Sequence, residues 1–467
     1  MVAFLATALL AGAVNAAPHR NPMGQRVALT EAHGRHSDTL IIKLAEDQNL
    51  VFEAGRLSGS PDQLHALLIG AKPLFQRSRT ALSADRARSD PEAKLADLSL
   101  YLRLQINDAE SQLPALLADP RIETAYLAPA HVPPPGDIAP TTPLFEDEQS
   151  YSEAGPHGFG FDIASRWPGG TGSNIWIGNI EYSFDPSHEA FNEIEVLELG
   201  HPTDLYSFHG NGVFGIMASP ADGYGVTGLV PGAQFAIVSP FSGPDVYNVA
   251  DAINVATSAL EPGDVLLIEQ QGWVFDTFTP VEIYPDIFDA IAQAVALGIV
   301  VIEPAGNGGC DLEDPVWEGW FDRSLRDSGA IMVGGGASPM SGLPARSWYP
   351  DGSCFGDRVD VQGWFDSIVT ASAGDGAPNF VDLFYPDMDG QQAYTANFGG
   401  TSGAAPLVAS IAAAMNAMAI ETRGAPFLPI DLRAAMISTG HPQPDAETHP
   451  IGPQPDLRRL MRIWGIR

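Results

Sequence analysis

Ser402 lies in a run of small residues, Gly-Gly-Thr-Ser-Gly-Ala-Ala-Pro at positions 399–406, which continues into an alanine-rich segment of low polarity at 407–420. A serine between small residues can be approached closely. At the first turn of a helix, the backbone N–H groups and the helix dipole also face any negative charge that develops there. These are the requirements of a nucleophilic serine. Serine and threonine are also ordinary helix N-caps, so the segment by itself fits either an active site or a structural turn.

The octapeptide resembles the nucleophile motif Gly-Thr-Ser-x-Ala-x-Pro of the subtilisin-like serine peptidases. The resemblance implies that Ser402 attacks a peptide carbonyl. Such a serine needs a histidine as base and a carboxylate that orients the histidine, and neither has to be near it in sequence. Candidates for both groups precede Ser402 in the chain.

The candidate base is His209. Positions 209–218, His-Gly-Asn-Gly-Val-Phe-Gly-Ile-Met-Ala, are similar to the family's His-Gly-Thr-His-Val-Ala-Gly block, in which the first histidine is the base at the start of a buried helix. Gly212 replaces the family's second histidine, and we expect this to change local packing but not proton transfer. The alternative is a histidine in a surface loop, although no other of the 11 histidines lies in a block of this kind.

The candidate acid is Glu181. It follows an apolar run at 175–180 that is typical of a short buried strand, and it stands seven residues before His188. The family's aspartate has this spacing to a His-Pro-Asp-Leu-like turn, so the resemblance places a glutamate where aspartate is usual. The extra methylene has to be absorbed, because ~1 Å of misplacement can cost on the order of 100-fold in rate. Two alternatives stay open: Asp185 orients His209, or Glu181 is a relic in an inactive enzyme.

Asn307 is the candidate oxyanion donor. A β-branched run at 299–303 ends in Pro-Ala-Gly-Asn-Gly-Gly, similar to the family's Ala-Gly-Asn loop, whose amide donates a hydrogen bond to the oxyanion. The resemblance implies that the backbone N–H of Ser402 is the second donor. A Gly-Asn-Gly segment alone is more often a turn. The four blocks nevertheless follow the family's chain order of acid, base, asparagine and nucleophile.

The segments between these blocks predict an α/β fold. Buried strands are expected at 234–238 and 264–268, and apolar residues recur with helical spacing over 283–295, before Gly298 and the strand at 299–303. Alternating strands and helices indicate a doubly wound, mostly parallel sheet, and the resemblance implies the subtilisin-like version of it. Ligands bind such a sheet at the carboxyl ends of its strands, where Glu181 and Asn307 fall.

One position in the sequence bears on substrate specificity. Glu269, in Glu-Gln-Gln-Gly at 269–272, stands where the family usually has Ser-Leu-Gly-Gly along the primary specificity pocket. If Glu269 points into that pocket, a basic substrate side chain is favoured. We prefer the alternative, in which the carboxylate faces away and is paired or solvated.

The chain is expected to have four parts. An apolar start with small residues at its end predicts a signal peptide over 1–17, and hence a secreted, extracellular or periplasmic protein. A proline-rich stretch predicts a linker over 131–154, since consecutive prolines stay extended. The subtilisin-like catalytic domain is expected over 155–467.

The remaining part, 18–130, is predicted to be a small α+β domain. Strand-like segments at 38–44, 98–106 and 122–127 surround a segment with helical spacing at 109–118. This order resembles the ferredoxin-like propeptide of the subtilisin-like peptidases, a folding assistant and intramolecular inhibitor that is removed on maturation. An unrelated accessory domain is the alternative.

Cysteine content and acidic motifs bear on cofactors. Cys310 and Cys354 are the only two cysteines, and in an oxidising compartment they form one disulfide; two buried free thiols are the alternative. A thiolate-rich zinc site is not expected from two cysteines. Asp-Met-Asp-Gly at 387–390 resembles part of a calcium loop but lacks its later acidic ligands, so we interpret it as a turn. No cofactor is predicted.

Charge excludes some partners. The formal net charge is −33, and the three lysines all lie before position 100. Such a surface repels nucleic acid and anionic membranes, and it suits salty surroundings. Apart from the N-terminal apolar run, we find no candidate transmembrane segment of ~18 uninterrupted apolar residues. Protein or peptide substrates and the propeptide are the expected partners of a monomeric enzyme.

The sequence therefore predicts a secreted serine endopeptidase with Glu181, His209, Ser402 and Asn307 as its site. The first alternative is a peptide-binding pseudoenzyme of the same fold that lost turnover through the Asp-to-Glu change. The second is an esterase of the α/β-hydrolase type, which is disfavoured because positions 400–404 lack the second glycine of Gly-x-Ser-x-Gly.

Overall fold

The structure is a computed structural model that describes residues 38–466 except 49, 54–55, 59–61, 90–94, 129–140, 351 and 375–381. The expected signal peptide at 1–17 and most of the proline-rich stretch lie outside the described residues. The chain divides into two compact units, Met1–Gly136 and Asp137–Arg467.

The N-terminal unit is built on a four-stranded antiparallel sheet in the order β4-β5-β1-β6. Its core is formed by Leu40 and Ile42 of the central strand and by Leu113 and Leu116 of α3. Strands and a helix are found where the sequence predicts them. The elements of this unit are β1 (Thr39–Leu44), β2 (Phe52–Glu53), β3 (Arg56–Leu57), α1 (Gln63–Leu67), β4 (Lys72–Pro73), α2 (Arg79–Ser89), β5 (Tyr101–Gln105), α3 (Ala109–Ala118) and β6 (Ile122–Leu127).

The second unit contains a seven-stranded parallel sheet in the order β15-β14-β13-β10-β7-β9-β8. After β7 the chain builds one side of the sheet, and from β10 onward it builds the other, so the strand order reverses between β7 and β10. This confirms the predicted doubly wound α/β sheet. Its strands are β7 (Trp176–Ile180), β8 (Val196–Leu199), β9 (Gln234–Val238), β10 (Val265–Ile268), β13 (Val300–Pro304), β14 (Ile331–Gly336) and β15 (Val361–Trp364).

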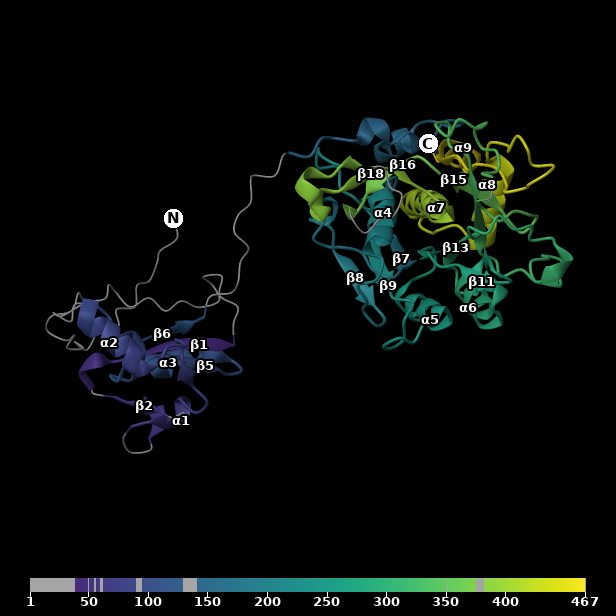
Figure 1. Ribbon diagram of the computed structural model, residues 1–467. Helices are drawn as coiled ribbons and strands as arrows, with labels where there is room; N and C mark the ends of the chain where they lie inside the picture. The colour runs from purple at the N-terminus through teal and green to yellow at the C-terminus, as the bar shows by residue number, and fades with distance from the viewer. Residues whose placement is uncertain are drawn as a thin grey trace. The chain divides into compact units, whose positions relative to one another are not determined.

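Helices cover both faces of this sheet. In Figure 1, β7, β9 and β13 lie between α4 and α7 on one side and α5 and α6 on the other. Side chains alternate accordingly along the buried strands: Ile177 joins the core under α4 and α7, and Ile180 joins the core under α5 and α6. The helices are α4 (Ser207–Met217), α5 (Val249–Ala259), α6 (Pro285–Ala296), α7 (Thr401–Arg423), α8 (Pro429–Thr439) and α9 (Leu457–Ile463).

Helix α7 is long and apolar enough to cross a membrane by length and composition, and it is the only such helix among the residues that the structure describes. However, 94% of its most apolar window is buried inside the unit. The helix backbone lies very close to the sheet: a Cβ at Gly363 of β15 would lie 2.3 Å from the carbonyl oxygen of Ala404. The helix therefore forms the centre of the protein core.

Smaller sheets and the segment before residue 155 complete the unit. The stretch 141–154, expected to be linker, packs into the core through buried Phe145 and Tyr151, and the Tyr151 hydroxyl donates a hydrogen bond to the Val369 carbonyl. The remaining strands are the hairpin β11 (Gly272–Val274) and β12 (Thr277–Thr279), and the three-stranded sheet of β16 (Ile368–Ala371), β18 (Tyr394–Phe398) and β17 (Asp382–Phe384).

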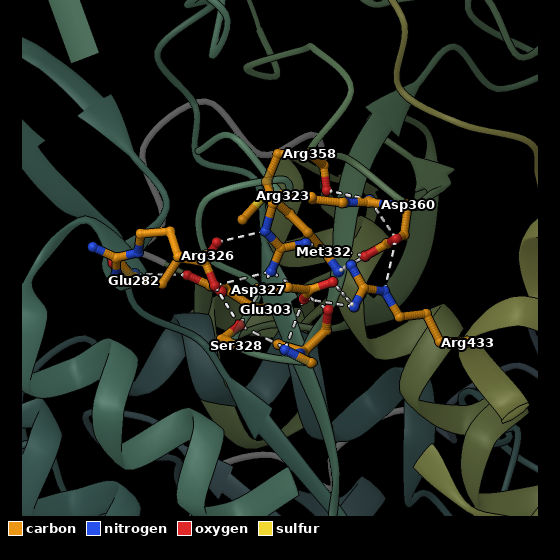
Figure 2. A network of polar contacts seen from close by, with 12 residues as sticks. Glu282, Glu303, Arg323, Arg326, Asp327, Ser328, Met332, Arg358, Asp360 and Arg433 are labelled. Carbon is orange, nitrogen blue, oxygen red and sulfur yellow. Dashed lines mark hydrogen bonds and ion pairs between the residues drawn. The ribbon is translucent and has the colours of Figure 1, made fainter. Parts of the chain in front are cut away.

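A buried ionic network ties strands of the sheet to α8 (Figure 2). Arg358 is 1% exposed, and its guanidinium donates to both carboxylate oxygens of Glu282, at 2.5 and 2.9 Å. It also contacts Asp360, which accepts a further bond from Arg433 of α8 at 2.9 Å. Buried charges of this kind persist only where each one is paired. The network therefore links segments that are far apart in the chain.

Candidate active site

Glu181 and His209 form a direct pair. Glu181 follows the last residue of β7 and is completely buried, and its Oε2 accepts a hydrogen bond of 2.6 Å from His209 Nδ1. Oε1 accepts a second bond of 2.8 Å from the backbone N–H of Tyr182. The glutamate curls back onto the next peptide group, and this absorbs its additional methylene. In the neutral form of the ring, the carboxylate fixes the proton on Nδ1 and leaves Nε2 as the acceptor.

Glycines bring His209 to this position. A Cβ at Gly210 would lie 2.0 Å from the Ser183 carbonyl oxygen, so the start of α4 can rest on the segment after β7 only without a side chain there. A Cβ at Gly212 would lie 2.4 Å from the ring of Phe398. Phe398 also contacts the His209 ring edge-on, with 5.8 Å between centroids. The aromatic ring thus takes space next to the position where the family has a second histidine.

Asp185 does not orient His209, and that alternative is wrong. Its Oδ1 accepts hydrogen bonds from the backbone N–H and the hydroxyl of Ser187, at 2.9 and 2.6 Å. Its own N–H donates to Asn211 Oδ1 at 2.8 Å. Asp185 therefore stabilises the turn after β7, and the partner of the imidazole Nδ1 is Glu181.

Asn307 contacts the N-terminus of α7. Its Oδ1 accepts hydrogen bonds from the backbone N–H and the hydroxyl of Thr401, at 2.8 and 3.1 Å. Because the acceptor end of the amide is used, its Nδ2 donor end remains available. The next N–H in the chain, that of Ser402, has no hydrogen-bond partner within the described part of the chain. Gly400, at φ +76°, gives the backbone the turn that precedes the helix.

The loop that carries Asn307 is held at several points. The backbone N–H of Asn307 donates to Gln271 Oε1 at 3.1 Å, and Thr277 of the β11–β12 hairpin donates to the Gly308 carbonyl at 3.0 Å. The predicted disulfide between Cys310 and Cys354 is present, with 4.4 Å between the Cα atoms. It fixes the loop a few residues beyond Asn307, and the two cysteines are not free thiols.

Glu269 lies beside this pair, whereas the sequence analysis considered it only as a residue of the specificity pocket. Its side chain is 4% exposed, and neither of its carboxylate oxygens has a hydrogen-bond partner among the described residues. The preferred expectation, a paired or solvated carboxylate, is therefore wrong. The signal that could have found it is an acidic residue directly after a buried strand, beside a second strand that ends in Glu181.

The electrostatics of the site follow from these contacts. Burial by itself lowers the pKa of His209, but the charge and the hydrogen bond of Glu181 outweigh it, and with a further contribution from Glu269 they raise that pKa to about 9. Burial raises the pKa of Glu269 to about 8, and the Glu181 charge adds to this, while His209 and the Ser402 hydroxyl oppose it. The ring is therefore an imidazolium, protonated on both nitrogens, at neutral pH, and it becomes a free base only in alkaline solution.

Among the described residues, no group of three or more His, Cys, Asp or Glu side chains is arranged to hold a metal ion. Residues 387–390 belong to two consecutive 3₁₀ turns, and the carboxylate of Asp389 accepts a bond from the backbone N–H of Gln391.

Comparisons with known proteins point to one family. The model of the subtilase family matches residues 172–452. Solved structures with similar folds include the protease domain of PatA (19% identity, TM-score 0.47, 62% of this chain and 95% of that chain) and a protease from Pseudoalteromonas arctica (16%, 0.49, 70% and 99%). Fervidolysin from Fervidobacterium pennivorans is also similar (16%, 0.46, 92% and 61%). No curated protein matches the chain.

Proposed function

The chain belongs to the subtilase family of serine peptidases, and from this premise we propose that it is a secreted serine endopeptidase with a Ser402–His209–Glu181 triad. The observation that carries the proposal is the 2.6 Å bond between Glu181 Oε2 and His209 Nδ1. This bond supports the assignment of Glu181 to the role that aspartate usually has in the triad. That role is to hold the imidazole in one tautomer and to stabilise the imidazolium.

The reaction has two halves. Ser402 Oγ attacks the peptide carbonyl carbon while His209 Nε2 takes its proton, and the carbonyl oxygen becomes an oxyanion that receives bonds from Asn307 Nδ2 and the Ser402 N–H. His209 then gives the proton to the departing amine as the C–N bond breaks. Water, deprotonated by the same imidazole, attacks the resulting ester and releases the acid product.

A fluorophosphonate reagent tests the proposal directly. We expect stoichiometric labelling of Ser402, none in Ser402→Ala and much slower labelling in His209→Ala. Ser410→Ala is the matched control, because Ser410 lies on the same helix and donates its hydroxyl bond to the Pro406 carbonyl. Absence of labelling in the wild-type protein at any pH supports the alternative, a peptide-binding pseudoenzyme. Turnover of esters alone would favour an esterase.

We further propose that the N-terminal unit is a propeptide that inhibits the enzyme until it is cleaved off in or near the linker. Its compact antiparallel fold and the proline-rich stretch after it support this. On incubation, the purified full-length protein should release a fragment of roughly 130 residues as peptidase activity rises, and Ser402→Ala should release none. If the wild-type chain stays intact while it is active, the maturation proposal fails.

A further inference from the structure

Glu269 is a second buried carboxyl of the site to which the triad gives no role. It follows β10 directly, and its N–H donates to the Ile180 carbonyl at 3.0 Å. Ile268 pairs with Ile180 in the parallel register, so Glu269 and Glu181 are neighbours at the ends of adjacent strands. This is also where the strand order of the sheet reverses, the place where such sheets bind ligands.

The side chain faces the catalytic side of the sheet. Val265 and Leu267 belong to the core under α4 and α7, and the alternation of side chains puts Glu269 on the same face. The titratable groups that act on it are His209 of α4 and Glu181 of β7, and α7 contributes the uncharged Ser402. The other neighbouring strand, β13, carries Glu303 on the opposite face, where its carboxylate accepts a bond from the Glu282 N–H.

The burial of Glu269 excludes the recognition of a basic substrate side chain. Both carboxylate oxygens lie beneath the protein surface, so a lysine or arginine of the substrate could not reach them without rearrangement. An unpaired buried carboxyl is costly to keep, because its desolvation is not repaid by hydrogen bonds. The Ser402 hydroxyl favours the ionised form, but it makes no hydrogen bond of good geometry with either carboxylate oxygen.

Resting on the proposed peptidase function, we infer that Glu269 is a residue that tunes the catalytic base: when it is ionised, its carboxylate stabilises the protonated His209 and thereby moves the onset of turnover to more alkaline pH. The proton transfers of the reaction are unchanged, since Ser402 still gives its proton to His209. The negative charge of the ionised Glu269 adds to that of Glu181 in stabilising the imidazolium. Its removal makes the free base available at lower pH.

The pKa directions agree with this geometry. Glu269 contributes to the raised pKa of His209, and the opposing effect of His209 lowers that of Glu269. As pH rises through about 8, Glu269 loses its proton, and its new charge retains the proton of His209 until about pH 9. The two groups thus titrate as a coupled pair.

The test is the pH dependence of kcat/KM for the matured enzyme, its Glu269→Gln variant and its Glu269→Ser variant. We expect the acidic limb to move down by on the order of one pH unit in both variants, and the activity relative to each plateau to rise between about pH 8 and 9, where Glu269 of the wild-type enzyme is ionised. Glu303→Gln is the matched control, since it changes a buried carboxyl of the adjacent strand on the other face. Its acidic limb should not move.

Failure of this inference can be distinguished from failure of the proposed function. If the wild-type enzyme is labelled by a fluorophosphonate but the limbs of wild-type and Glu269→Gln coincide, Glu269 is only structural. A changed preference for basic substrates without a shifted limb also overturns the inference. Titration of the His209 imidazole by NMR in Ser402→Ala, with and without Glu269→Gln, gives a readout without turnover: the same midpoint in both proteins refutes the inference.

Discussion

At the residue scale, the glutamate at position 181 is accommodated because its carboxylate bends back to the next peptide group. The bond from the Tyr182 N–H to Oε1 fixes one oxygen, and the other oxygen then meets His209. An aspartate on the same backbone would be shorter by one methylene. Sequence alignment by motif located this residue, but only the conformation of the side chain shows that it reaches the imidazole.

This leads to a first prediction. Glu181→Asp should withdraw the carboxylate by ~1 Å or more and lower kcat on the order of 100-fold. Asp185→Asn is the control, because Asp185 only accepts bonds within its own turn, and its kcat should remain near that of the wild type. Steady-state kinetics on a peptide substrate measures both. An unchanged kcat in Glu181→Asp would contradict the assigned role.

A second prediction concerns Asn307. Asn307→Asp keeps the acceptor that holds the Thr401 N–H but replaces the Nδ2 donor with an anionic oxygen. We expect kcat to fall about 100- to 1,000-fold, a range that comes from subtilisin itself and not from this chain. KM and the melting temperature should change little. A large fall in melting temperature would instead indicate that Asn307 is chiefly a cap of α7.

At the scale of elements, the ionic network places charged side chains in the core, and their desolvation opposes folding. Arg358 lies between Glu282, before α6, and Asp360, before β15, so its guanidinium joins two segments that are far apart in the chain. In the sequence, the charged residues of this network cannot be distinguished from ordinary surface charges. Periodicity cannot show that they are buried, because their partners are 76 and 2 positions away.

The third prediction follows from this network. Arg358→Met should destabilise the second unit by about 3–5 kcal/mol, because it leaves the buried Glu282 carboxylate without a cationic partner. Arg166→Met, at an exposed arginine, should cost less than about 0.5 kcal/mol. Urea unfolding of the full chain, with tryptophan fluorescence as the signal, measures the difference. Equal stability of the two variants would show that the network contributes nothing.

At the scale of the whole molecule, the net charge of −33 dominates. The described residues form two units, each with its own apolar core, and an excess of carboxylates over cations repels itself across their surfaces. Salt screens this repulsion, because the Debye length falls from roughly 10 Å at 0.1 M to 3 Å at 1 M.

The fourth prediction is therefore a rise in melting temperature between 0.05 and 1 M sodium chloride. Calorimetry at pH 7 measures it, and Ser402→Ala should be used so that self-cleavage does not interfere. Chloride is preferable to sulfate, which stabilises proteins in general through exclusion from their surface. A constant or falling melting temperature would show that surface repulsion is not a destabilising factor in this protein.

The sequence alone was enough to predict the doubly wound α/β class and several of its strands and helices, and to propose four residues for the site. Short-range patterns record these features: apolar runs, helical spacing, and glycines where backbones touch, such as Gly210 on Ser183. The tertiary structure decided how Glu181 reaches His209, that Asp185 bonds Ser187 instead, and that Glu269 is buried beside them. Those outcomes depend on side-chain direction and on burial among strands distant in the chain, which no local pattern encodes.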